Sequence, residues 1–216
     1  IAEALEIAPG DSVIDVGCGS GVLSFVAARL GAKRVIGTDL SEEAIQVAKE
    51  NAVRLGLQDQ VEFRSGNLLD PVRGELADVI IGDVSGIPDE IGRLAGWFPD
   101  GRAGGPTGAE LPAAMLESIN ENQCLAPGGH LYLPTGTIQA ESKILEVARR
   151  IFGAANLQSL ISQKFPLPEV VDARFVDPDE PPGPPAEVIG VSSIDGRRRG
   201  LPGIVDQTYV LRDRGP

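Results

Sequence analysis

The sequence is poor in cysteine, in basic residues and in long apolar runs, and each shortage argues against a class of protein. Among its 216 residues are only two cysteines, Cys18 and Cys124, which form no C-x-x-C pair and indicate no disulfide framework. The 19 Lys and Arg are outnumbered by 31 Asp and Glu, and the net charge of −12 disfavours a nucleic-acid partner because an acidic surface repels phosphates. No apolar run approaches the ~20 residues of a membrane span, and no signal peptide is apparent. We therefore expect a cytoplasmic enzyme or binding domain without a membrane partner.

Apolar strands and amphipathic helices alternate along the chain and predict a single α/β domain over residues 1–216. The expected sheet is doubly wound, mostly parallel and seven-stranded, with helices on both faces as in a Rossmann-like fold. Strands are expected at 12–16, 33–38, 61–64, 78–82, 130–133, 157–165 and 207–212. Helices are expected at 1–7, 21–30, 42–55, 89–94, 111–122 and 141–152.

Two segments interrupt this alternation. Residues 84–110 are rich in glycine and proline, and so long an irregular stretch within a compact domain is usually functional, which predicts a lid-like insert. Residues 178–185 hold five prolines in eight positions and predict an extended connector.

The first predicted strand runs into a glycine-rich loop, Asp15-Val16-Gly17-Cys18-Gly19-Ser20-Gly21. The glycines permit a tight turn and close backbone approach, and the following helix start offers free N–H groups, as in nucleotide-binding loops. A dinucleotide fingerprint would place its third glycine at position 22, which is Val22 here, and this disfavours a nicotinamide cofactor. A purely structural turn is the alternative.

Further polar or glycine-rich features follow the next strands. In doubly wound sheets ligands bind outside the carboxyl ends of the strands, so these features are expected to converge. Asp39, at the end of the second strand, can accept hydrogen bonds from both hydroxyls of a ribose. Its alternative role is a carboxylate that flanks a helix. Ser65-Gly66-Asn67-Leu68 follows the third strand and Asp83-Val84-Ser85-Gly86 the fourth.

Residues 12–83 resemble the nucleotide-binding half of the class I S-adenosylmethionine-dependent methyltransferases. The stretch VIDVGCGSGVLSFVAARLGAKRVIGTDLSEEAIQVAKENAVRLGL is most similar to the small-domain members, which include ribosomal-protein lysine and release-factor glutamine methyltransferases. The resemblance implies S-adenosyl-L-methionine as the cofactor. It places Asp15 near the methionine end of the cofactor and Gly17, Cys18, Gly19 and Gly21 along it. It also implies that Asp39 binds the ribose, that Leu40 lies beside the adenine, that Asn67 contacts the adenine amino group and that Leu68 donates its N–H.

The end of the fourth strand departs from that family. Relatives that methylate planar amides or exocyclic amines share an N-P-P-Y tetrad there, whereas this chain has Asp83-Val84-Ser85-Gly86. The difference argues against glutamine, adenine and cytosine as methyl acceptors. Asp83 faces the expected position of the methyl group and is both a cofactor contact and a candidate general base, and Ser85 is a candidate for orienting the acceptor. Each has an alternative in an ordinary turn.

Substrate contacts are expected from the long insert, at Trp97, Phe98 and Arg102. Trp97 and Phe98 could equally anchor the loop, and Arg102 could be solvated. His130, the single histidine, is expected at the start of the fifth strand, away from the ligand crevice. No metal site is expected.

The sequence thus predicts an S-adenosylmethionine-dependent methyltransferase that acts on a small molecule or a protein side chain. The alternatives are another reaction of the same cofactor, such as aminocarboxypropyl transfer or cyclisation, and a non-catalytic methyltransferase-like partner subunit. The sequence indicates no oligomeric state.

Overall fold

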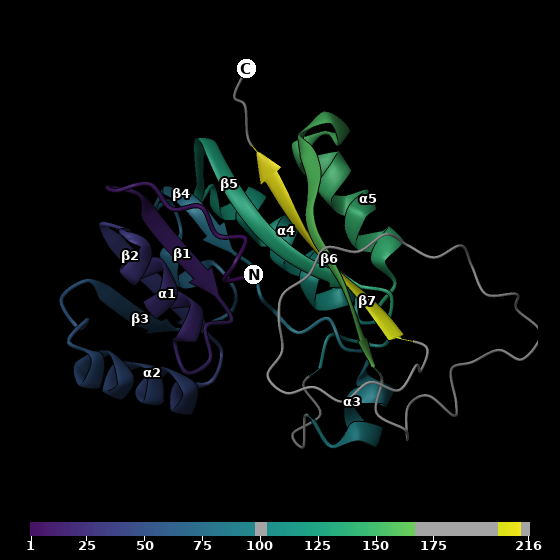
Figure 1. The fold of residues 1–216 in the computed structure, drawn as a ribbon, viewed down its shortest axis with the longest axis horizontal. Coiled ribbons are helices and arrows are strands. Elements are labelled where there is room, and N and C mark those ends of the chain that lie inside the picture. Colours follow the sequence, from purple (N-terminus) through teal and green to yellow (C-terminus); the bar gives the residue numbers. More distant parts are fainter. Residues whose placement is uncertain (98–102, 167–202, 213–216) are drawn as a thin grey trace, which may run out of the picture.

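The chain folds as an α/β protein with helices on both sides of one sheet (Figure 1). The computed structural model describes residues 1–97, 103–166 and 203–212. The strands are β1 (Ser12–Val16), β2 (Arg34–Asp39), β3 (Val61–Ser65), β4 (Ala77–Ile81), β5 (Leu125–Gly136), β6 (Leu157–Pro166) and β7 (Gly203–Arg212). The α-helices are α1 (Val22–Leu30), α2 (Glu42–Leu55), α3 (Asp89–Ala95), α4 (Glu110–Asn122) and α5 (Glu141–Phe152), with short 3₁₀ turns at Asp70–Val72 and Ala154–Asn156.

Within the described ranges the seven strands form one sheet in the order β3-β2-β1-β4-β5-β7-β6. Strands β1 to β5 pair in parallel, and β7 runs antiparallel to both β5 and β6. The predicted fold, a doubly wound and mostly parallel seven-stranded sheet, is confirmed. Because β1 to β4 are parallel, their carboxyl ends lie along the same edge of the sheet.

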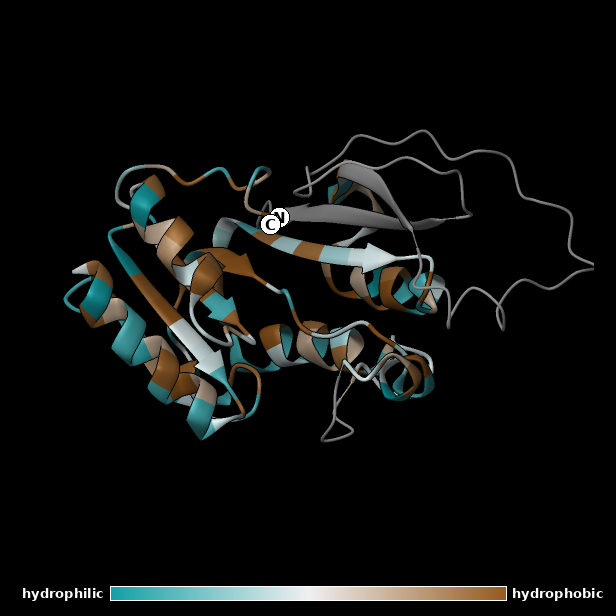
Figure 2. Cartoon of the chain, turned by 60° about the horizontal axis from the view of Figure 1, so that its bottom comes forward, coloured by the Kyte–Doolittle hydropathy of each residue, from teal (hydrophilic) through white to brown (hydrophobic). Residues whose placement is uncertain are grey.

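Two apolar layers hold the helices against the sheet. Neighbouring residues of β1 point to opposite faces, so Val13 packs with the layer under α1 and α2 while Ile14 packs with the layer under α4 and α5. Such two-sided burial explains why the central strands are apolar almost throughout. Figure 2 shows the same division, with apolar colour on the inner strands and hydrophilic colour on the outer sides of the helices.

Helix α2 shows how local sequence sets the helix ends. The Ser41 hydroxyl caps its first turn by accepting a hydrogen bond from the Ala44 N–H at 3.2 Å, and Glu42 and Glu43 suit the positive end of the helix dipole. Gly56 ends it in the left-handed conformation (φ +67°). Asp39, two residues before Ser41, is the last residue of β2 and therefore lies at the carboxyl edge of the sheet.

Two predicted elements differ from the structure. Residues 2–4 form a turn and residues 5–7 have no regular structure, in place of the predicted helix. The Glu6 N–H donates to the Tyr132 hydroxyl at 3.0 Å, a tertiary contact that takes the place of a helical bond. Strand β5 begins at Leu125 instead of residue 130, because 126–129 form an irregular bulge opposite Asp78 rather than a turn before the strand.

The single-domain organisation with an insert at 84–110 stays a prediction, and the predicted connector at 178–185 lies outside the described residues. None of the helices in the described ranges has the length and apolar character needed to cross a membrane.

Candidate functional site

The glycine loop after β1 turns tightly and is tied to β2. The N–H groups of Gly17 and Cys18 donate to the Thr38 carbonyl at 2.8 and 3.0 Å. Gly21 has φ +89°, and a Cβ there would lie 2.7 Å from the ring of Phe25, so a side chain would strain the backbone and force the ring to shift. A Cβ at Gly19 would meet nothing within 4 Å. The loop is therefore packed on its inner side and has open space beside Gly19.

Asp39 fastens this loop to the start of α2. One carboxylate oxygen accepts a hydrogen bond from the Gly19 N–H and the other from the Ser41 N–H, both at 2.9 Å. Each oxygen retains lone pairs for further donors, so the fixed carboxylate can still accept bonds from two sugar hydroxyls. The same geometry also fulfils the alternative, helix-flanking role.

A cavity of about 610 Å³ opens over the carboxyl ends of β1 to β4, within the usual size range of small-molecule sites. Its lining includes seven residues predicted for the site, namely Gly17, Asp39, Leu40, Asn67, Leu68, Asp83 and Ser85. Residues from four strand ends therefore meet in one place.

Leu68 reaches the cavity from an uncommon backbone conformation. It has φ +49°, a region that branched and bulky residues rarely adopt, and its carbonyl accepts a hydrogen bond from the Thr38 hydroxyl at 2.7 Å. Such strain is found at functional sites, where the surrounding structure holds it in place. Thr38 also binds the glycine loop through its carbonyl, so one residue holds both Leu68 and the glycine loop in place.

Asp15 and Cys18 lie behind the cavity wall rather than in its lining. Asp15 is 1% exposed and accepts a hydrogen bond from the Ser24 hydroxyl at 2.6 Å. Burial raises the pKa of Asp15 to about 7, and the nearby negative charge of Asp83 adds to the effect. Burial also raises the pKa of the Cys18 thiol, which keeps it protonated. Their predicted cofactor roles, and those of Gly19 and Gly21, stay predictions.

The two catalytic candidates lie in residues 83–85, the part of the cavity wall that follows β4, which we call the wall after β4. Asp83 is accessible from the cavity, and desolvation by the surrounding protein raises its pKa, which makes it a stronger proton acceptor than an ordinary aspartate. The Ser85 hydroxyl accepts a long hydrogen bond of 3.4 Å from the Ile87 N–H, as in an ordinary serine turn. Both residues reach the cavity, and their catalytic roles stay predictions.

None of the predicted substrate contacts that the structure describes is found in the cavity lining. Trp97 is 44% exposed, follows the last turn of α3 and does not line the cavity. Phe98 and Arg102 lie outside the described residues. Lining residues that sequence reasoning missed are Thr38, Ser41, Val84, Asp89, Ala103, Gly105 and Leu111. Thr38 and Ser41 flank Asp39 and Val84 follows Asp83, so proximity could have indicated them, whereas no sequence pattern singles out Ala103 or Leu111.

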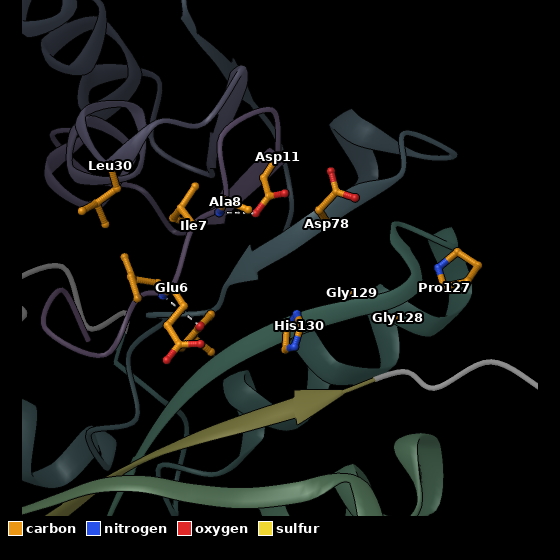
Figure 3. Close-up of a pocket in the computed structure, with 12 residues that line it drawn as sticks. Glu6, Ile7, Ala8, Asp11, Leu30, Asp78, Pro127, Gly128, Gly129 and His130 are labelled. Atoms are coloured by element: carbon orange, nitrogen blue, oxygen red, sulfur yellow. Dashed lines mark hydrogen bonds between the residues drawn. The ribbon is translucent and has the colours of Figure 1, made fainter.

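A second cavity, of about 650 Å³, lies at the opposite edge of the sheet, where β4 begins (Figure 3). His130 lines it together with Asp11 and Asp78. The side chain of Asp78 is occupied by the Ser12 N–H and hydroxyl, both at 2.8 Å. His130 therefore lies away from the site, as predicted. Among the described residues no group of three His, Cys, Asp or Glu side chains could hold a metal ion.

Comparison with known proteins supports the methyltransferase class that the sequence predicts. Residues 3–87 match the family model described as "Ribosomal protein L11 methyltransferase (PrmA)". The ribosomal protein L11 methyltransferase of Desulforamulus reducens is 49% identical over 75 residues, 35% of this chain and 24% of that protein. That of Listeria monocytogenes is 30% identical over 145 residues, 67% of this chain and 38% of that protein.

A solved structure extends the likeness in fold to nearly the whole chain. The crystal structure of ribosomal protein L11 methylase from Lactobacillus delbrueckii subsp. bulgaricus superposes with a TM-score of 0.53 over 96% of this chain and 73% of that one, at 18% identity. The resemblance recognised in the sequence is thereby confirmed: residues 3–87 are similar to a methyltransferase family, and nearly the whole chain shares the fold of a ribosomal protein L11 methylase. The matched family uses S-adenosylmethionine as its methyl donor, in agreement with the predicted enzyme class and cofactor.

The matches cover the two halves of the site unequally. The family model ends at residue 87, just after the wall that carries Asp83 and Ser85. The chain spans between about a quarter and two fifths of the length of these two curated relatives. Fold and cofactor class are therefore established by the comparisons, whereas the activity and the acceptor are matters for proposal.

Proposed function

We propose that the chain transfers the methyl group of S-adenosylmethionine to an amine of a protein substrate. The supporting observation is the cavity of about 610 Å³ in which the glycine loop, Asp39 and Asp83 meet. A protein acceptor is favoured by the names of the relatives, which are ribosomal protein L11 methyltransferases. It also fits the absence of the tetrad that relatives use on planar nitrogens.

The residues present fit the cofactor. Asp39 would accept hydrogen bonds from the ribose hydroxyls, while Leu40 and Leu68 supply apolar surface for the adenine. Gly17 lines the cavity, so the glycine loop can contact the ligand there through its backbone. When bound, the cofactor supplies a methyl group already activated on a sulfonium.

The remaining chemistry falls to the wall after β4. Aligning the acceptor in line with the methyl group is the main requirement, and water must be excluded. Asp83 would accept the proton that the amine loses, because its raised pKa makes it a stronger base than an ordinary aspartate. Ser85 would orient the acceptor through its hydroxyl. Neither role needs a metal ion.

Calorimetric titration with S-adenosylhomocysteine and, separately, with NAD tests the binding half of this proposal. We expect S-adenosylhomocysteine to bind and NAD not to bind. Asp39→Asn should weaken S-adenosylhomocysteine binding about tenfold, because one charge-assisted acceptor is lost. The matched control is Asp59→Asn, the same change on an exposed turn, which should leave the affinity unchanged.

The reaction itself is tested by incubating the chain with S-adenosylmethionine and ribosomal protein L11 and analysing the products. We expect S-adenosylhomocysteine and a methylated protein. Methylthioadenosine would instead indicate transfer or cyclisation of the aminocarboxypropyl arm. Binding without any turnover would favour the non-catalytic partner subunit, and binding of NAD alone would overturn the cofactor assignment.

A further inference from the structure

Three backbone segments far apart in the sequence meet beside the cavity, and we name them together the acceptor platform. They are residues 84–89 after β4, residues 103–109 before α4, and residues 136–140 between β5 and α5. Backbone hydrogen bonds join the first two, from the Gly104 N–H to the Ile87 carbonyl (2.6 Å) and from the Asp89 N–H to the Gly105 carbonyl (2.9 Å). The Ala140 N–H joins the third by donating to the Thr107 carbonyl at 2.9 Å.

Glycines allow these segments to pack backbone against backbone. A Cβ at Gly104 would lie 2.7 Å from the Ser85 carbonyl oxygen, and one at Gly108 would lie 2.4 Å from that of Gly86. Contacts so close leave no space for side chains between the segments. The position of Ser85, and through it of the whole wall after β4, therefore depends on how the segments are held together.

The side chain of Gln139 sits at the junction. Two carbonyl oxygens, those of Gly86 and Gly108, face its amide, and only an NH₂ group can serve both, which fixes the orientation of the amide. Its nitrogen then donates to Gly108 at 3.0 Å and to Gly86 at 3.2 Å, while its oxygen accepts from the Gly136 N–H. Both donors and the acceptor of one side chain thus connect all three segments.

We propose that Gln139 is a positioning residue that fixes the acceptor side of the cavity, a role that rests on the proposed methyl transfer. It does not line the cavity itself. It acts through the backbone of Gly86 and Gly108, whose segments present Ser85 and Gly105 to the ligand space. The cofactor side, built on the glycine loop and Asp39, shares none of these bonds.

The test compares Gln139→Met, which keeps the length but removes the hydrogen bonds, with Gln139→Glu, which turns a carboxylate towards the carbonyl oxygens. Gln58→Met and Gln58→Glu make the same changes on an exposed turn and serve as controls. The measurements are amide hydrogen exchange with bound S-adenosylhomocysteine, the dissociation constant of S-adenosylhomocysteine, and kcat and KM with ribosomal protein L11 as acceptor. If Gln139→Glu does not fold, Gln139→Met carries the test.

For Gln139→Met we expect exchange at 84–89 and 103–109 to become about tenfold faster while residues 15–21 are unchanged. S-adenosylhomocysteine affinity should stay within about twofold of wild type, and kcat/KM should fall about 10- to 100-fold, because small misplacements of reacting groups are costly. Gln139→Glu should show a larger effect in the same places.

Two results would overturn the inference. One is wild-type exchange at the acceptor platform in Gln139→Met. The other is a loss of S-adenosylhomocysteine affinity in step with kcat/KM, which would make Gln139 a general stability residue. Failure of the proposed function is distinguishable, because the wild-type chain would then bind no S-adenosylhomocysteine or methylate no protein, while the exchange comparison would still decide the role of Gln139.

Discussion

The two sides of the cavity are built by different means. The cofactor side uses a continuous strand–loop–helix unit, in which a tight glycine turn and one carboxylate, Asp39, hold the loop at Gly19. The acceptor platform is assembled from three separate segments, joined by close glycine packing and by the side chain of Gln139. The family match ends at residue 87, close to the boundary between them.

This difference explains why the family model ends at residue 87, where the acceptor platform begins. A ligand that is the same in every relative constrains a short local motif, because its ribose and adenine always need the same contacts. A side built from separate segments constrains mainly their relative placement, which many sequences can achieve. The chain can therefore keep the cofactor side while replacing the N-P-P-Y tetrad.

The largest effect, on the stability of the fold, is expected from adding a side chain at Gly21 in the glycine loop. Gly21→Ala should destabilise the fold by about 2–5 kcal/mol, the sum of left-handed backbone strain and overpacking against Phe25 and Phe63. Urea denaturation measures this. Gly56→Ala is the control, because Gly56 also has a positive φ but has nothing within 4 Å of a Cβ. It should cost only the strain of about 1–2 kcal/mol. Equal losses at both positions would show that packing at Gly21 is unimportant.

The next effect concerns the pH dependence of stability, through Asp15. Its pKa is about 7 in the folded chain against a usual value of 3.8, so between these values the folded state holds a proton that the unfolded state has lost. Stability should therefore fall as pH rises from about 4 to 7, by roughly 3 kcal/mol from this group.

Asp15→Asn should remove the pH-dependent part of the stability that comes from Asp15. The free energies of unfolding of the variant at pH 5 and pH 8, measured by denaturation, should therefore differ less than those of wild type. The variant should gain most, relative to wild type, at pH 8. Asp59→Asn, on an exposed turn, controls for the loss of one negative charge. An unchanged pH dependence in Asp15→Asn would contradict the burial argument.

The smallest effect is expected on the acceptor side. Asp83→Asn should lower kcat about 100-fold with ribosomal protein L11 as acceptor, because the proton acceptor is lost. The affinity for S-adenosylhomocysteine should change little. Since the pKa of Asp83 is raised, the wild-type rate should increase with pH above the usual range of an aspartate, and this limb should be absent in the variant. A full rate in Asp83→Asn would remove it from the mechanism.

Local sequence was sufficient wherever an element depends on its own residues. Strand β1 and the caps of α2 at Ser41 and Gly56 lie where the sequence predicts them, because apolar runs and cap chemistry are local. The glycine loop and Asp39 also converge as expected, because parallel strands bring their carboxyl ends to one edge.

The sequence-based predictions are wrong or incomplete where contacts between distant parts of the chain determine the local structure. Residues 1–7 have a helical apolar pattern, but Glu6 bonds to Tyr132, 126 residues away. The turn-like Pro127-Gly128-Gly129 is a bulge that continues pairing with β4. Gln139 could not have been identified from sequence, because its partners are main-chain carbonyls of distant glycines, which leave no pattern of residue types.

The most direct test of the account is the structure of the chain with S-adenosylhomocysteine bound. We expect the ribose hydroxyls within hydrogen-bond distance of the Asp39 carboxylate, the adenine against Leu40 and Leu68, and the sulfur directed towards Asp83. A ligand found in the cavity at the opposite edge, or a ribose out of reach of Asp39, would contradict the assignment of this cavity as the cofactor site.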